Sequence, residues 1–197
     1  MVQQLRIALI GGESTGKSTL ARGLAELTHG VVVTEVLRSF VEEHGRTPVQ
    51  SEQRSILVAQ HAREISAAQE FPHAVILCDP ATTMTAIYSE LYFQDSSLRD
   101  EALQYTAEYD ALLWCRPDIP WVDDAGQHDG PQFREAADQI IEQWFAELCA
   151  ITTVIQITGA QGRIAQAQGL LTEEFGRVWQ HSGTDLSTYT GPNGSAT

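Results

Sequence analysis

A glycine-rich segment near the beginning of the chain carries the residues with the clearest chemistry. It reads GGESTGKS from Gly11 to Ser18 and satisfies the pattern G-x-x-x-x-G-K-[ST] in full. Glycines at this spacing let backbone N–H groups surround phosphate oxygens, while the lysine and the following hydroxyl suit the β- and γ-phosphates and Mg²⁺. The pattern predicts a nucleoside triphosphate site made of Gly11, Gly12, Glu13, Ser14, Thr15, Gly16, Lys17, Ser18 and Thr19.

The one lysine of the chain lies within this segment. Lys17 is the one lysine among the 12 basic residues, and the others are arginines. Because the guanine-reading signature of Ras-like GTPases needs a lysine outside the phosphate loop, the composition excludes a GTPase of that type. Adenine is therefore the expected base, with ATP and Mg²⁺ as the expected ligands.

The same segment also fits a second pattern, G-x-S-x-G, which is typical of the nucleophile elbow of hydrolases. Ser14 would then be the nucleophile, and Asp124 and His128 would be available to complete a catalytic triad. That interpretation gives no role to Lys17 or Ser18, so we favour phosphate binding.

Two carboxylates follow apolar runs that we expect to be strands. Glu35 follows the second run and Asp79 the third, and the carboxyl ends of parallel strands meet at one edge of a sheet. Phosphoryl transfer needs a group that accepts the proton of the attacking hydroxyl and a carboxylate that helps to hold Mg²⁺. We predict Glu35 as the base and Asp79, with Ser18, as the metal-side residues. The alternatives are a helix N-cap at Asp79 and a solvated first-turn glutamate at Glu35.

Alternating apolar runs and helical patterns surround these residues. The runs are rich in Val, Ile and Leu without polar alternation, as in strands covered on both faces. Between the second and third runs, Thr47 and Pro48 resemble a capping box with proline at the first helical position, which predicts a helix to about residue 70. The sequence predicts a three-layer α/β fold with a mostly parallel five-stranded sheet. The expected strands are Leu5–Ile10, Val31–Thr34, Ala74–Cys78, Ala111–Cys115 and Thr152–Ile157.

Charge and composition exclude several classes of partner. The chain has 12 basic and 26 acidic residues, a net charge of −14, and no basic patch for nucleic acid or for an anionic membrane surface. It has no signal-peptide pattern, and its three cysteines lie apart among apolar neighbours, as buried thiols do. We expect a cytoplasmic protein with a small-molecule partner, and the sequence gives no oligomeric state.

Several segments together resemble NadR-type ribosylnicotinamide kinases over roughly residues 5–165. They are GGESTGKSTL, EVLRSFVEEHGR, VILCDPATTMTAIYSELYF and RPDIPWVDDAGQHDG, in this order. The resemblance implies a nucleoside-kinase-like P-loop NTPase fold, an AAA-type ATPase domain, and ATP- and Mg²⁺-dependent phosphorylation of nicotinamide riboside to nicotinamide mononucleotide. NadR proteins often also carry a DNA-binding segment and an adenylyltransferase domain. We expect only the kinase part here, with a domain over residues 1–181 and a flexible tail over 182–197.

The sequence departs from that family at two places. The family usually has Asp-Thr where this chain has Asp79 and Pro80, and it has Asp-Gly-x-Arg where this chain ends the element with Gln127. The missing arginine normally belongs to a lid over the phosphates. Arg134 is our candidate to replace it, and Arg163 is expected to stack on adenine or to serve as that substitute.

The resemblance also implies a cationic substrate, because the pyridinium ring of nicotinamide riboside carries a fixed positive charge. Trp121 and Asp124 suit such a ring through cation–π and charge contacts, and Tyr88 could line the same slot. Arg38 would orient Glu35 or the ribose. The alternatives are a Trp121 packed on its own loop, a Tyr88 in the core and an Arg38 in a surface ion pair.

Two other functions remain open from the sequence. One is a P-loop kinase for another nucleoside or a small alcohol. The other is a regulatory module that binds ATP or a pyridine nucleotide with little catalysis, which the missing lid arginine would explain.

Overall fold

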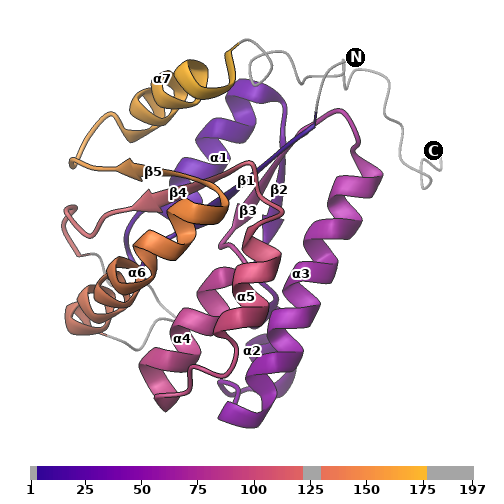
Figure 1. Cartoon of the computed structure of the whole chain (residues 1–197), viewed down its shortest axis with the longest axis vertical. Helices are drawn as coiled ribbons and strands as arrows, with labels where there is room; N and C mark the ends of the chain where they lie inside the picture. Colours follow the sequence, from indigo (N-terminus) through magenta and orange to yellow (C-terminus); the bar gives the residue numbers. More distant parts are fainter. Residues whose placement is uncertain (1–3, 122–129, 177–197) are drawn as a thin grey trace, which may run out of the picture.

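Five parallel strands in the order β2-β3-β1-β4-β5 form the centre of the molecule (Figure 1). The computed structural model describes residues 4–121 and 130–176. The strands are β1 (Leu5–Ile10), β2 (Val31–Thr34), β3 (Val75–Asp79), β4 (Ala111–Cys115) and β5 (Thr153–Ile157). The helices between and after them are α1 (Lys17–Thr28), α2 (Val36–His44), α3 (Gln53–Glu70), α4 (Thr83–Phe93), α5 (Arg99–Thr106), α6 (Pro131–Ile151) and α7 (Arg163–Phe175).

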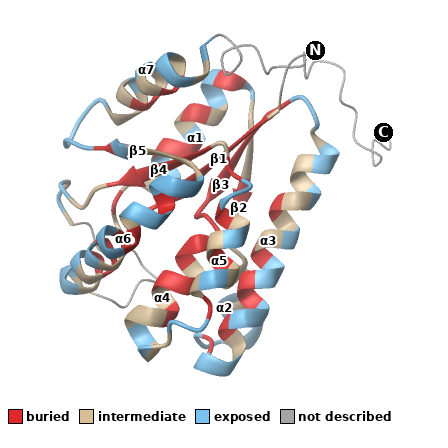
Figure 2. Cartoon of the chain, in the orientation of Figure 1, coloured by how far each residue is buried: buried red, intermediate tan, exposed pale blue. Residues whose placement is uncertain are grey.

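Helices cover both faces of the sheet, which makes three layers. One apolar core joins alternate strand residues such as Ile7 and Leu9 to α1 and α7. The other joins Ala8 and Ile10 to α3, α4, α5 and α6. All six residues of β1 are buried (Figure 2), as expected for a strand covered on both sides. The predicted three-layer α/β fold with a five-stranded parallel sheet is therefore confirmed.

The strand boundaries follow the sequence closely. β1, β2 and β4 have the predicted bounds, whereas β3 and β5 begin one residue later than predicted and β3 includes Asp79. The predicted helix start at Thr47 is wrong. A short 3-10 turn, Gln50–Glu52, precedes α3, and its cap is Val49, whose N–H donates to the Glu52 carboxylate at 2.9 Å.

The remaining structural expectations have mixed outcomes. Cys78 and Cys115 are buried, but Cys149 is exposed on α6, so the prediction of three buried thiols is wrong for it. Across residues 4–121 and 130–176, no helix has the length and apolarity that crossing a membrane would need. Asp124, His128 and the predicted tail lie outside the described residues.

Candidate active site

The phosphate loop connects the end of β1 to the first turn of α1, and it holds all the predicted loop residues from Gly11 to Thr19. The ammonium of Lys17 donates to the carbonyl oxygens of Gly11 at 2.9 Å and Gly12 at 2.7 Å. Ser18 and Thr19 are exposed in the first turn of α1, where the N–H groups have no helical acceptor. A lysine charge in the loop and unbonded N–H groups at the start of the following helix are the groups that bind an anion.

The backbone of this loop requires its first glycine. Gly11 has a φ of +140°, and a Cβ there would lie 2.6 Å from the carbonyl oxygen of Cys115. The hydroxyl of Thr15 donates to the carbonyl of Gly12 at 2.8 Å and closes the loop from inside. Position 11 therefore requires glycine, because the loop approaches the end of β4 closely there.

The two predicted carboxylates lie next to one another at the carboxyl edge of the sheet. Thr34 pairs with Asp79 in the β2–β3 register, so Glu35 follows directly beside Asp79. Glu35 is half-buried and caps α2 without a side-chain hydrogen bond. Burial raises the pKa of its carboxyl, and the charges of Lys17 and Arg38 oppose that rise. Glu35 is therefore not a solvated first-turn glutamate, and its proton affinity is increased.

Asp79 ends β3 with its side chain buried. Its Oδ1 atom has no hydrogen-bond partner among the described residues. The N-cap of α4 is Thr82, so the interpretation of Asp79 as a helix cap is wrong. A buried carboxylate oxygen without a donor suits a hydrated cation. Mg²⁺ commonly uses one or two protein carboxylates together with phosphates and water.

Arg134 lies against the phosphate loop from the start of α6. It is 7% exposed, and its backbone packs on Gly12. One guanidinium nitrogen donates to the carbonyl of Ile119 at 2.9 Å, while its Nε is buried with no partner in the described part of the chain. The guanidinium carbon lies 5.5 Å from the centre of the Trp121 ring. The backbone of Arg134 thus lies against the phosphate loop, and its guanidinium lies beside Ile119 and Trp121.

Arg163 also contacts the phosphate loop, where it acts as a clamp between three chain segments. Its guanidinium donates to the carbonyls of Thr15 at 2.8 Å, Arg116 at 2.9 Å and Gly159 at 2.6 Å, and it pairs with the carboxylate of Asp118. These contacts join the phosphate loop to the ends of β4 and β5. This clamping role was missed from the sequence, and adenine stacking by Arg163 stays a prediction.

Tyr88 belongs to an aromatic row between α4 and the start of α6. Its ring centre lies 5.9 Å from that of Tyr92, which lies 5.8 Å from that of Phe133. Tyr88 is partly buried against the core, and Phe133 immediately precedes Arg134. Phe133 was not predicted as part of this row. Arg38 is exposed on α2, with no ion pair found for it among the described residues.

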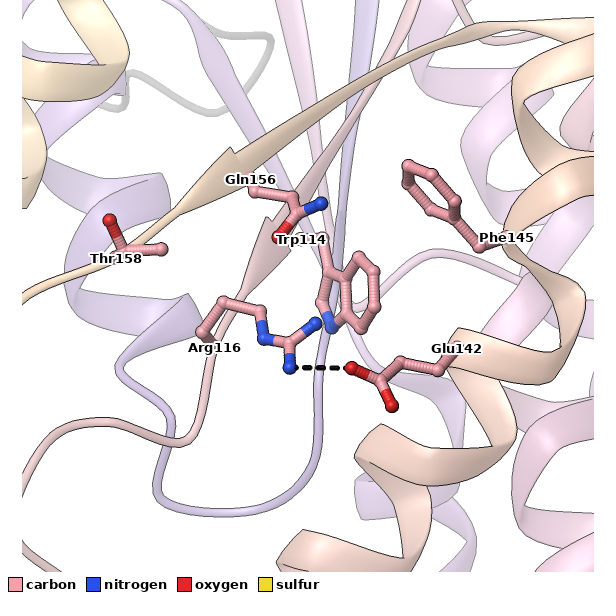
Figure 3. Close-up of a pocket in the computed structure, with 6 residues that line it drawn as sticks. All are labelled: Trp114, Arg116, Glu142, Phe145, Gln156 and Thr158. Carbon is pink, nitrogen blue, oxygen red and sulfur yellow. Dashed lines mark hydrogen bonds and ion pairs between the residues drawn. The ribbon is translucent and has the colours of Figure 1, made fainter.

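A surface groove of about 580 Å³ lies beside β5 and α6 (Figure 3). Arg116 points across it to Glu142, with an N–O distance of 2.8 Å, and packs 4.1 Å from the centre of a Trp114 ring. None of the predicted site residues lines this groove. The carboxylate pair and the phosphate loop therefore define the candidate site, and the groove lies apart from it.

Two curated sequence relatives carry the same name. The trifunctional NAD biosynthesis/regulator protein NadR of Salmonella typhimurium is 24% identical over 174 residues, which are 86% of this chain and 42% of the relative. The protein of the same name from Escherichia coli is 26% identical over 121 residues, 60% of this chain and 30% of the relative. The chain thus spans less than half the length of these curated relatives.

Solved structures share the fold at low sequence identity. A NadR protein in complex with NR gives a TM-score of 0.69 at 20% identity and covers 88% of this chain and 51% of that one. A deoxyadenosine kinase from M. mycoides with bound dCTP gives 0.62 at 12% identity and covers 86% and 100%. These matches show a P-loop NTPase fold, which leaves the hydrolase elbow without support. The profile of the AAA domain family matches residues 6–163, so the chain belongs to the AAA domain family.

Proposed function

We propose that this chain is an ATP-dependent kinase that phosphorylates a ribosyl 5′-hydroxyl, with nicotinamide riboside as the acceptor. The observation that carries the proposal is the β2–β3 register, which sets Glu35 beside Asp79 at the edge where Lys17 and the phosphate loop lie. The NadR relatives, one of them solved with NR, support this choice of acceptor.

The residues of this chain have distinct parts in the proposed transfer. Lys17, the first amides of α1 and Arg134 neutralise the charge on the γ-phosphoryl group. Glu35 takes the proton of the acceptor hydroxyl while the new O–P bond forms and the bond to the β–γ bridging oxygen breaks, which releases ADP. The raised pKa of Glu35 makes it a better proton acceptor than an ordinary glutamate.

Mg²⁺ would be held by Ser18 and Asp79, directly or through water, and when bound it supplies charge neutralisation at the β- and γ-phosphate oxygens. The unpartnered Oδ1 of Asp79 is the observation that fits it.

In this proposal the acceptor site lies near α2, α4 and the described segment that ends at Trp121. Arg38 orients the ribose, and Tyr88 and Trp121 lie against the ring. Asp124 lies outside the described residues and remains a candidate on sequence grounds. A cytoplasmic location and a small-molecule partner stay predictions.

ADP release on a panel of acceptors tests the proposal. Nicotinamide riboside should give the highest kcat/KM, with nicotinamide mononucleotide as the product. Turnover of a deoxynucleoside or a small alcohol with none of nicotinamide riboside would assign another acceptor. Tight ATP binding without ADP release from any acceptor would instead indicate a regulatory nucleotide-binding module.

A further inference from the structure

A third carboxylate lies beneath the candidate site, on α3. Glu64 is 0% exposed, on a helix that packs along β2, β3 and α2 (Figure 1). Burial raises the pKa of its carboxyl, and hydrogen bonds from Tyr109, Gln60 and Thr82 oppose that rise. A buried carboxyl is costly unless its oxygens are satisfied, and here both of them are.

One set of these contacts leads to Glu35. The Oε1 atom of Glu64 accepts a hydrogen bond from the amide nitrogen of Gln60 at 3.1 Å. This contact orients the Gln60 amide so that its oxygen accepts the N–H of Val36 at 2.8 Å. Val36 directly follows Glu35. Arg63, on the same helix, donates to the carbonyl of Glu35 at 3.3 Å.

The other set leads to Asp79. The same Oε1 atom of Glu64 accepts the hydroxyl of Thr82 at 3.0 Å, and the Oε2 atom accepts the hydroxyl of Tyr109 at 2.6 Å. The Tyr109 oxygen in turn accepts the N–H of Thr82 at 3.0 Å. Thr82 lies three residues after Asp79, so two bonds of this cluster hold the segment that leaves the strand at Asp79.

We propose that Glu64 is a positioning residue that sets the placement of Glu35 relative to Asp79. Strands β2 and β3 are paired in the sheet as far as Thr34 and Asp79. Beyond that pair, the segments that follow the two strands are joined through the Glu64 carboxyl. The inference rests on the proposed function of Glu35 and Asp79. Small misplacements of reacting groups cost large factors in rate, about 10²-fold for 1 Å.

Three variants test the two sets of contacts separately; the set that leads to Glu35 and the set that leads to Asp79 are called branches below. Gln60→Leu removes the branch to Glu35, and we expect a lower kcat with an unchanged Mg²⁺ requirement. Thr82→Val keeps the shape but removes the hydroxyl on the Asp79 branch, so the Mg²⁺ concentration for half-maximal ATP binding should rise. Glu64→Gln weakens both sets of contacts and should show both effects: kcat lower by about tenfold or more, and a higher Mg²⁺ concentration for half-maximal ATP binding. The KM for ATP at saturating Mg²⁺ should stay nearly unchanged.

Asp138→Asn is the matched control. Asp138 is also a buried carboxyl whose pKa is raised by burial, but it lies on α6 and accepts the indole N–H of Trp114 at 2.8 Å. This variant should lower Tm as Glu64→Gln does and leave kcat and the Mg²⁺ requirement unchanged. If the control lowers kcat as much as Glu64→Gln does, the effect is one of general stability and the inference is wrong.

Amide hydrogen exchange gives a readout that needs no catalysis. Glu64→Gln should speed exchange at both Val36 and Thr82, and Asp138→Asn at neither. Unchanged exchange at the two amides, or faster exchange with a wild-type kcat, overturns the inference. If the wild-type protein phosphorylates no acceptor, the proposed function fails, while the exchange and the Mg²⁺-dependent ATP binding still decide whether Glu64 couples the two segments.

Discussion

Gly12 lies directly against Arg134: a Cβ atom on Gly12 would come within 2.9 Å of the Arg134 Cα and 2.8 Å of its carbonyl oxygen. Both contacts are to backbone, which cannot rotate away as a flexible side chain can. The start of α6 is therefore packed on the phosphate loop, and this contact holds Arg134 next to the loop.

Gly12→Ala should separate the loop from α6. Overpacking of this kind costs about 1–3 kcal/mol, so we expect a lower Tm together with a higher KM for ATP. Gly169→Ala is the control, because Gly169 lies within α7 with nothing within 4 Å of its added Cβ, and alanine there should stabilise the helix by about 1 kcal/mol. Thermal melts and ATP titrations measure both. An unchanged KM for ATP in Gly12→Ala would show that the contact has no part in nucleotide binding.

Arg134→Lys tests the proposed replacement for the lid arginine. Lysine keeps the charge but loses the planar fork and the Nε group, so kcat should fall by roughly 10²-fold while the fold is kept. Arg99→Lys makes a comparable change at an arginine whose guanidinium lies 4.6 Å from the Trp144 ring, away from the site, and should leave kcat unchanged. Steady-state kinetics compare the two. Equal kcat values for Arg134→Lys and the wild type would remove Arg134 from the mechanism.

The pH profile tests the state of Glu35. A base must be unprotonated to act, and its pKa is raised above 4.5, so the acid limb of kcat/KM should lie above that value. The Arg38 charge lowers the pKa of Glu35, and Arg38→Gln should therefore move this limb to higher pH. Arg54→Gln, which removes an exposed charge on α3, should leave it in place. A limb that stays in place or moves to lower pH in Arg38→Gln contradicts the assignment.

Much of this arrangement could be predicted from the sequence. The apolar runs predict the strand boundaries to within one residue, because strands buried on both faces consist almost entirely of apolar residues. The spacing of the glycines and the lysine likewise predicts the phosphate loop. The contacts of Arg163 and Glu64 could not be predicted in this way. Several of these contacts join residues far apart in the chain, such as Glu64 with Tyr109, 45 residues away, and Arg163 with Thr15, 148 residues away, and they depend on packing that no local pattern encodes.

Trp121→Leu tests whether the acceptor ring is recognised as a cation. Cation–π contacts contribute about 0.5–2 kcal/mol, so the KM for nicotinamide riboside should rise roughly 2- to 30-fold. The reduced, uncharged form of the same nucleoside is the control, and its KM should rise less in Trp121→Leu. If the KM rises equally for both forms, the ring is held by shape and Trp121 makes no charge-specific contact.

The most direct test of the account is ADP formation from ATP and nicotinamide riboside by the wild-type protein and by Glu35→Gln. We predict that the glutamine variant binds ATP with unchanged affinity and that its kcat falls by roughly 10²- to 10⁴-fold, as expected for loss of a general base. A Glu35→Gln variant that turns over at the wild-type rate would contradict this account and make Asp79 the next candidate for the base.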